Sequence, residues 1–283
     1  MGAKFIAKWI LAFLITLPAG ASRSYSQAAA PALSAADAQA LVQRALANEM
    51  DAAKNAGRPM RYTLHKITPR LTTTKQIIET SDGDVARLIE VNGKSLNPEA
   101  EQREMARLDA LAVNQADQDH RKQTEDSDRA RAIKILRALP MAFAYTYTGP
   151  GMGATGPVEM YSFAPKPGYS PSGMETQILT GMTGNIAVDP VAGRVARLEG
   201  RLRKDVNFGW GIVGRLNKGG WIVIDQAPVV DGQWRAIRLQ LVMAGRILFI
   251  TKKYDMLEEQ SNYRPVVEHL DYREAIGMLK KEP

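Results

Sequence analysis

Cysteine is absent from the sequence, and histidine occurs only three times. Without cysteine the chain can form no disulfide, use no thiol in catalysis and carry no lipid on an N-terminal cysteine. The histidines, His65, His120 and His269, lie far apart and lack the spacing of zinc ligands. We therefore expect no metal site and no cofactor, and a fold that relies on its apolar core.

Long hydrophobic runs are also lacking beyond the N-terminus. There, lysines flank an apolar run over residues 5–17, and an Ala-x-Ala pattern follows that ends at Ala21. This order is typical of a secretory signal peptide. We predict a signal peptide over residues 1–21, with a second cleavage candidate that extends it to residue 30, and a linker over residues 22–33. A retained membrane anchor is the alternative, although the run is short for a bilayer span.

Positive charge is in moderate excess, because the sequence contains 37 Lys and Arg residues and 30 Asp and Glu residues. The resulting charge of +7 suits anionic lipid or glycan surfaces, or a solvated basic surface without a dedicated partner. An exported protein does not meet nucleic acid. We therefore predict a periplasmic or secreted protein with no nucleic-acid partner and at most peripheral membrane contact.

Short strands separated by turns make up most of the remaining chain. Apolar residues alternate with charged ones over residues 194–202, which is typical of a strand with one buried face. Turn residues such as those at 218–220, 231–232 and 244–245 separate similar segments. The pattern predicts strands at 60–67, 72–80, 85–91, 142–148, 158–163, 185–188, 194–202, 220–225, 233–241 and 246–251, and an edge strand at 266–270.

Helical spacing occurs in three places. One helix is predicted from Ser34 onward, one insertion over about residues 97–140, and one closing helix over residues 271–281. Within the insertion, residues 117–131 carry mixed charges and almost no apolar residue, which suits a solvated helix or a mobile excursion. We predict a mainly β (α+β) fold over residues 34–283: one strongly curved antiparallel sheet, or open half-barrel, covered by helices.

Two segments match the glycine pattern of dinucleotide sites, at residues 151–156 and 209–214. A nucleotide site needs a strand before the glycines and a helix after them, whereas a strand follows both segments here. The first predicts a flexible loop and the second a sharply bent strand. Carboxylates such as Glu258 and Glu259 form no recognisable acid and base pair. We predict no enzymatic activity; a hydrolase is the alternative, without identifiable catalytic residues.

Four large aromatic residues lie on consecutive predicted strands: Trp210, Trp221, Trp234 and Phe249. A curved sheet brings such residues near one another, where they can line an apolar pocket. These four are therefore the predicted ligand-binding residues. The alternative is that they fill an ordinary core beneath the helices.

The N-terminal helix, the insertion over residues 97–140 and the strand series over 185–202 and 221–249 resemble the periplasmic lipoprotein-sorting carriers and their relatives, the Lol carrier fold. The resemblance implies that the concave apolar face of the sheet holds acyl chains and that helices act as a lid. The chain departs from that family in its long charged insertion, and no defined lipoprotein-binding arginine aligns to it.

We therefore predict an exported, non-enzymatic carrier or binding protein for a hydrophobic or lipid-modified ligand. One alternative is an envelope sensor or protein-interaction domain that has a filled core and an envelope protein partner. An outer-membrane barrel is a further alternative. Charged residues such as Arg197, Glu199 and Arg235 recur along the strands and argue against the apolar belt that a barrel needs.

Overall fold

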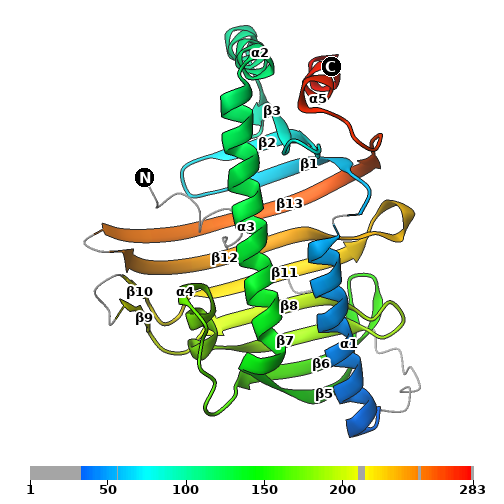
Figure 1. Cartoon of the computed structure of the whole chain (residues 1–283), viewed down its shortest axis with the longest axis vertical. Helices are drawn as coiled ribbons and strands as arrows, with labels where there is room; N and C mark the ends of the chain where they lie inside the picture. Colours follow the sequence, from blue (N-terminus) through cyan, green and yellow to red (C-terminus); the bar gives the residue numbers. More distant parts are fainter. Residues whose placement is uncertain (1–32, 56, 210–213, 248–249, 282–283) are drawn as a thin grey trace, which may run out of the picture.

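The computed structural model describes residues 33–55, 57–209, 214–247 and 250–281. The strands form one antiparallel sheet in the order β4-β3-β2-β1-β13-β12-β11-β8-β7-β6-β5, and β9 and β10 attach at β12 (Figure 1). Their bounds are β1 Met60–Ile67, β2 Thr72–Ile78, β3 Val85–Val91, β4 Lys94–Ser95, β5 Phe143–Gly153, β6 Gly156–Pro165, β7 Met182–Asp189, β8 Arg194–Leu202, β9 Val206–Phe208, β10 Gly214–Leu216, β11 Trp221–Pro228, β12 Trp234–Ile247 and β13 Ile250–Pro265. The sheet stays open between β4 and β5, which confirms the predicted fold class.

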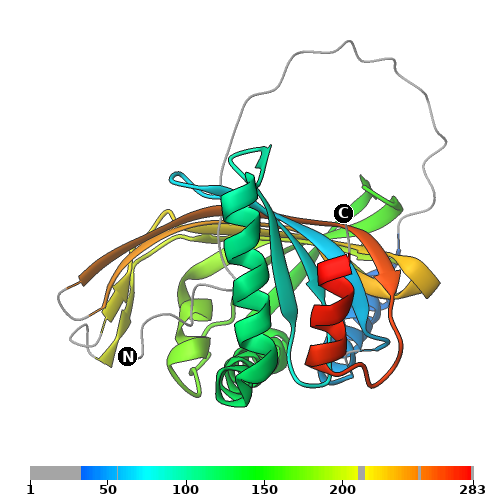
Figure 2. The ribbon, with the colours of Figure 1, turned by 90° about the horizontal axis from the view of Figure 1, so that it is seen from above.

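The helices α1 and α3 lie on the concave side of the arched sheet (Figure 2). Two long helices cross this side, α1 and α3, while α2 and α5 pack at the β2–β3 end (Figure 1). None of the helices in the described part of the chain combines the length and apolar character that a bilayer crossing needs. Their bounds are α1 Ala35–Lys54, α2 Pro98–Val113, α3 Gln115–Ala142, α4 Met174–Gln177 and α5 Tyr272–Lys281, with 3-10 turns η2 Ile178–Gly181 and η4 Val230–Gly232.

Local sequence explains where α1 begins and which face it buries. Ser34 caps the helix, because its Oγ accepts a hydrogen bond of 3.2 Å from the backbone N–H of Asp37. The carboxylate of Asp37 in the first turn also suits the positive end of the helix dipole. One apolar stripe of α1 is buried: Ala38, Leu41, Val42, Ala45 and Leu46.

The charged part of the insertion is regular helix rather than an excursion of the chain. Residues 117–131 belong to α3, and two polar side chains within this stretch are buried, Gln118 and Asp128. Pro140 lies inside the helix, which continues to Ala142, so the predicted end at Pro140 is wrong. The side chain of Ala142 is fully buried, and packing against the sheet supports this last turn.

Two predictions near the C-terminus are wrong, one of a turn and one of a strand. The predicted turn at residues 244–245 lies inside β12. Glycine is needed there for another reason, since a side chain on Gly245 would come within 2.6 Å of the carbonyl oxygen of Arg215 in β10. This glycine permits close approach of two strands rather than a turn. The predicted edge strand at 266–270 is a turn, whose Val266 and Leu270 side chains pack with α2 and α5, while β13 extends through Pro265.

The glycine segment at residues 151–156 closes the β5–β6 hairpin, where Gly153 pairs with Gly156. The second segment begins at Gly209, which has a φ of 53°, and ends at Gly214 in β10. Residues 210–213 between them lie outside the described residues, and so does the predicted bend.

Candidate functional site

The concave face of the sheet is apolar between β6 and β13. Buried side chains from successive strands meet the inner sides of α1 and α3 there and form the largest hydrophobic cluster. We call this area the apolar half of the concave face. Its strand residues include Tyr161, Phe163, Ile186, Val188, Leu202, Ile222, Leu239, Leu241 and Met256.

Polar contacts at both ends hold α1 against the apolar half. Near its start, the hydroxyl of Tyr161 donates to the carbonyl oxygen of Ala38 at 2.9 Å. Near its end, the buried carboxylate of Glu49 accepts hydrogen bonds from Arg194 Nε at 2.7 Å and from Gln226 Nε2 at 3.0 Å. A buried carboxylate with this many donors is well compensated, so α1 is firmly attached.

The first half of α3 is attached through polar contacts to the turn between β2 and β3. Gln118 Nε2 donates to the carbonyl oxygen of Asp82 at 2.6 Å, and Arg121 Nη2 donates to that of Asp84 at 2.9 Å. In return, the backbone N–H of Asp84 donates to Glu125 Oε2 at 2.9 Å. This half of the helix therefore depends on hydrogen bonds, while Ala138 and Leu139 in its second half pack in the apolar cluster.

Two buried acceptors on α3 lack a donor. Asp128 is 4% exposed, and its Oδ1 accepts from Arg131 at 2.9 Å, but no described group donates to its Oδ2. Gln118 is fully buried, and its Oε1 is likewise without a donor among the described residues. Each such atom costs about 1–3 kcal/mol of desolvation. The buried polar groups of α3 are therefore only partly hydrogen-bonded, whereas the buried carboxylate of α1 has its donors.

The concave face becomes polar towards β1 and β13. Glu258 of β13 lies opposite Leu239 of the apolar half and opposite Lys66 of β1, whose Nζ is 2.7 Å from Glu258 Oε1. Four residues before Lys66, and so on the same face of β1, Tyr62 stacks on Tyr263 with ring centroids 5.1 Å apart. We call Tyr62, Lys66, Glu79, Glu258 and Tyr263 the polar half of the concave face.

Burial shifts the pKa of several groups in and beside the polar half. It raises the pKa of Tyr62, an effect that the negative charges of Asp84 and Glu79 reinforce. It also raises the pKa of Glu79, against the opposing effect of Arg235, whose Nη2 lies 3.2 Å from Glu79 Oε2. The pKa of Lys75 is lowered by burial and then by the nearby Lys66. The polar half is thus a poorly hydrated group of ionisable side chains.

The predicted aromatic residues do not gather in one place. Trp221 opens β11 opposite Val242, and strand alternation directs its side chain away from the face of Ile222, which belongs to the apolar half. Trp234 lies at the other end of the same strand pair, opposite Pro228. Its side chain packs beside Val158, Ala187 and Ala196. The guanidinium of Arg194 lies 5.7 Å from the centre of its ring. Trp210 and Phe249 lie outside the described residues. A ligand contact by any of the four stays a prediction.

Sequence reasoning missed Glu49 and the polar half. A signal was present, since glutamate on the apolar stripe of an amphipathic helix and lysine on an otherwise buried strand face both break the local pattern. Their partners are 145 residues away for Glu49 and 192 for Lys66, so no local motif pairs them.

No family model matches the chain, and no curated protein matches it. Among solved structures, it is similar to a putative outer membrane lipoprotein-sorting protein domain from Vibrio parahaemolyticus, with 10% identity, coverage of 86% of this chain and 100% of that chain, and a TM-score of 0.32. It is also similar to a DUF1329 family protein from Desulfovibrio piger ATCC 29098, with 12% identity, coverage of 81% and 93%, and a TM-score of 0.28.

A third similar structure is MucB in complex with MucA(peri), with 10% identity, coverage of 82% of this chain and 100% of that chain, and a TM-score of 0.22. The first of the three matches is the kind of domain that the sequence resembles. All three TM-scores lie below 0.5, so these likenesses carry no argument about function.

Proposed function

We propose that the protein is an exported, non-enzymatic carrier or binding protein that takes a hydrophobic or lipid-modified ligand onto the concave face of its sheet. The observation that supports this best is the cover of the apolar half: it spans strands from β6 to β13, and among the described residues helices, not a second sheet, lie over it. One of them, α3, is attached by hydrogen bonds and carries two unpaired buried acceptors. A predicted signal peptide and the absence of cysteine favour a soluble exported form.

In the proposed mechanism α3 acts as a lid. It turns about its junction with β5, between Ala142 and Phe143, and releases its hydrogen bonds to residues 82–84. An acyl chain then covers apolar surface that α3 leaves farther from this pivot, such as the contacts of Ile135 and Leu136, and gains about 0.8 kcal/mol for each buried CH₂ group. The polar end of the ligand lies towards the polar half of the concave face, where Lys66 can meet an anionic group.

Lipid content is the direct test. Protein purified from the cell envelope is extracted with organic solvent, and the extract is analysed by mass spectrometry beside an extract of an unrelated exported protein. We expect lipid at a fixed ratio to this protein only. Protein that is reproducibly empty, and that takes up no fluorescent fatty acid from vesicles, would contradict the proposal.

A disulfide that fixes α3 tests the lid. Gly83 and Lys122 are close neighbours, because an ideal side-chain carbon on Gly83 would lie 3.3 Å from the Cα of Lys122. A disulfide between Gly83→Cys and Lys122→Cys is therefore within reach, although the φ of 99° at Gly83 strains the new side chain. The chain has no other cysteine, so this pair is unambiguous. We expect the oxidised protein to take up fatty acid at least about tenfold more slowly than the reduced double variant, which controls for strain at Gly83. Equal uptake in both redox states would contradict a moving α3.

The predicted aromatic residues are tested in the same assay. Trp221→Phe and Trp234→Phe each remove one of the four tryptophans and keep an aromatic ring. If a tryptophan contacts the ligand, the fluorescence change on fatty-acid uptake falls in its variant alone. An unchanged signal in both variants would remove these two residues from the site.

A second candidate function is an envelope sensor or protein-interaction domain without a lipid ligand. The specific observation in its favour is that the helices fill the apolar half, since Val42, Ala45 and Ala142 are fully buried. A hollow of about 460 Å³ on the outer side of α3, lined by charged residues such as Asp119, Lys122 and Asp126, offers a contact surface. Crosslinked envelope proteins that depend on residues 97–131, together with empty protein, would favour this candidate.

A further inference from the structure

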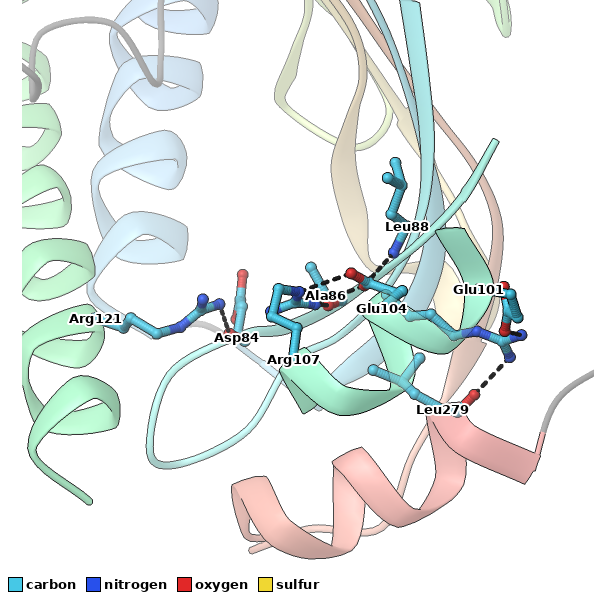
Figure 3. A network of polar contacts seen from close by, with 9 residues as sticks. Asp84, Ala86, Leu88, Glu101, Glu104, Arg107, Arg121 and Leu279 are labelled. Carbon is cyan, nitrogen blue, oxygen red and sulfur yellow. Dashed lines mark hydrogen bonds and ion pairs between the residues drawn. The ribbon is translucent and has the colours of Figure 1, made fainter. Parts of the chain in front are cut away.

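The two edges of the sheet end differently. At the β3 edge, α2 supplies side chains to the outward backbone groups: Glu104 Oε1 accepts from the N–H of Leu88 at 2.7 Å, and Arg107 Nη2 donates to the carbonyl oxygen of Ala86 at 2.6 Å (Figure 3). Glu104 and Arg107 also pair with each other, and the short β4 covers the end of β3. This edge cannot accept another strand, because helix side chains already occupy its donors and acceptors.

At the other edge, β5 has no such cover in the part of the chain that the structure describes. The N–H of Lys166 donates to the carbonyl oxygen of Ala142, which fixes the phase of the β5–β6 ladder. By the alternation of an antiparallel ladder, the N–H and C=O groups of Phe143, Tyr145 and Tyr147 then point away from β6. The N–H of Phe143 donates to the carbonyl oxygen of Leu139 in the last turn of α3. No described residue supplies a hydrogen-bond partner to the outward groups of Tyr145 and Tyr147.

The side chains along β5 also lack the features that normally protect an edge strand. Residues 143–148 contain no charge and no proline, and the ladder is regular up to Tyr147. A bulge at Thr148, between Tyr147 and Gly149, and then Pro150 disturb the strand only at the far end of this stretch. Tyr145 and Tyr147 are half-buried and pack on rings of β6, with centroid distances of 6.2 Å to Phe163 and 5.4 Å to Tyr161. An added strand would complete this aromatic layer with apolar side chains.

The opposite face of the same edge has a cationic hollow. Its volume is about 360 Å³, and small residues of β5, β6 and β7 line it, among them the exposed Ala144 and Thr146. Arg203 is the charged residue of the lining. Its Nε donates to Thr183 Oγ1 at 3.0 Å. Among the described residues Arg203 makes no ion pair. A carboxylate beside β5 on this face would meet an uncompensated positive charge.

We propose that residues 143–148 of β5 form a docking edge that pairs with an extended segment of a partner protein, in which apolar residues alternate with acidic ones. The backbone of the segment bonds to the outward groups of Tyr145 and Tyr147. Its apolar side chains cover Tyr145 and Tyr147, and its carboxylates lie on the side of Arg203. A second copy of this chain fits less well, because its own β5 would bring no carboxylate to the hollow.

Three short fluorescent peptides test the docking edge with the full mature chain. One alternates valine and glutamate, one alternates valine and lysine, and the third is the valine–glutamate peptide with every second backbone amide N-methylated. Binding is measured by fluorescence anisotropy. We expect the valine–glutamate peptide to bind, the lysine peptide to bind about fivefold more weakly and the methylated peptide at least about tenfold more weakly. Equal binding of the methylated peptide would overturn strand pairing.

Exposed arginines provide the matched variants. Arg203→Glu should weaken the glutamate peptide about fivefold and reverse the preference between the two charged peptides, while Arg246→Glu, on an exposed residue of β12, should change neither. A glutamate preference that survives Arg203→Glu would overturn the role of the hollow.

Amide hydrogen exchange locates the contact. The amides of Tyr145 and Tyr147 should exchange rapidly in the free protein and become protected only with the glutamate peptide. Protection of both amides without peptide, together with a dimer in sedimentation, would assign the edge to a second copy and overturn the proposal.

Discussion

The two long helices over the concave face differ in how they are attached. α1 buries an apolar stripe, and its one buried carboxylate, Glu49, is saturated with donors. α3 is longer, but over its first half it holds to the sheet through Gln118, Arg121 and Glu125, and it leaves Asp128 only partly satisfied. The proposed lid rests on this difference, because α3 has fewer satisfied contacts to release than α1.

Removing the anchor of α1 should have the largest effect. Glu49→Ala leaves the guanidinium of Arg194, whose side chain is 15% exposed, without its carboxylate. We expect the free energy of unfolding, measured by urea denaturation, to fall by about 3 kcal/mol. Asp51→Ala on the exposed face of α1 is the control and should change it by less than about 0.5 kcal/mol. Equal small effects would mean that α1 is held by its apolar stripe alone.

Repairing the attachment of α3 should have a smaller effect in the opposite direction. Asp128→Leu removes the buried acceptor that lacks a donor, while the side chain of its partner Arg131 is 38% exposed and can be solvated. We expect stability to rise by about 1 kcal/mol and fatty-acid uptake to slow. Asp126→Leu, on an exposed site of the same helix, controls for helix propensity. A loss of stability in Asp128→Leu would show that the carboxylate is compensated.

The smallest predicted effect concerns pH. Burial raises the pKa of Glu79 above its ordinary value of 4.5, so the folded state binds the proton more tightly than the unfolded state. The stability that follows is present below the ordinary pKa and is lost as pH rises through the higher, folded value. We expect Glu79→Gln to gain stability relative to the wild type, by less than about 1 kcal/mol, as pH increases from 4 to 7. A difference that is flat with pH would contradict the raised pKa.

Much of the fold was predictable because the signals are local. Alternation over residues 194–202, the helix start at Ser34 and the turn at residues 218–220 each depend on only a few neighbouring residues. The errors have a different origin. Gly245 was predicted to lie in a turn, but glycine is needed there because β10 approaches closely. Val266 was predicted to lie in a strand, but its side chain packs against α5.

The candidate site was less predictable, because its residues meet only after folding. The predicted tryptophans were chosen as large residues on neighbouring strands, and the described pair lies at opposite ends of β11 and β12. The polar half pairs Lys66 with Glu258, and the side chains of α3 meet the β2–β3 turn, at separations that no motif spans.

By itself the sequence determined the kinds of elements and the antiparallel class, because periodicity, caps and turns depend on neighbouring residues. Long-range contacts set the crossing of the concave face by α3, the closure of the β3 edge by α2 and, among the described residues, the open edge at β5. These outcomes depend on which distant backbone groups find partners, and local sequence does not record such long-range pairing.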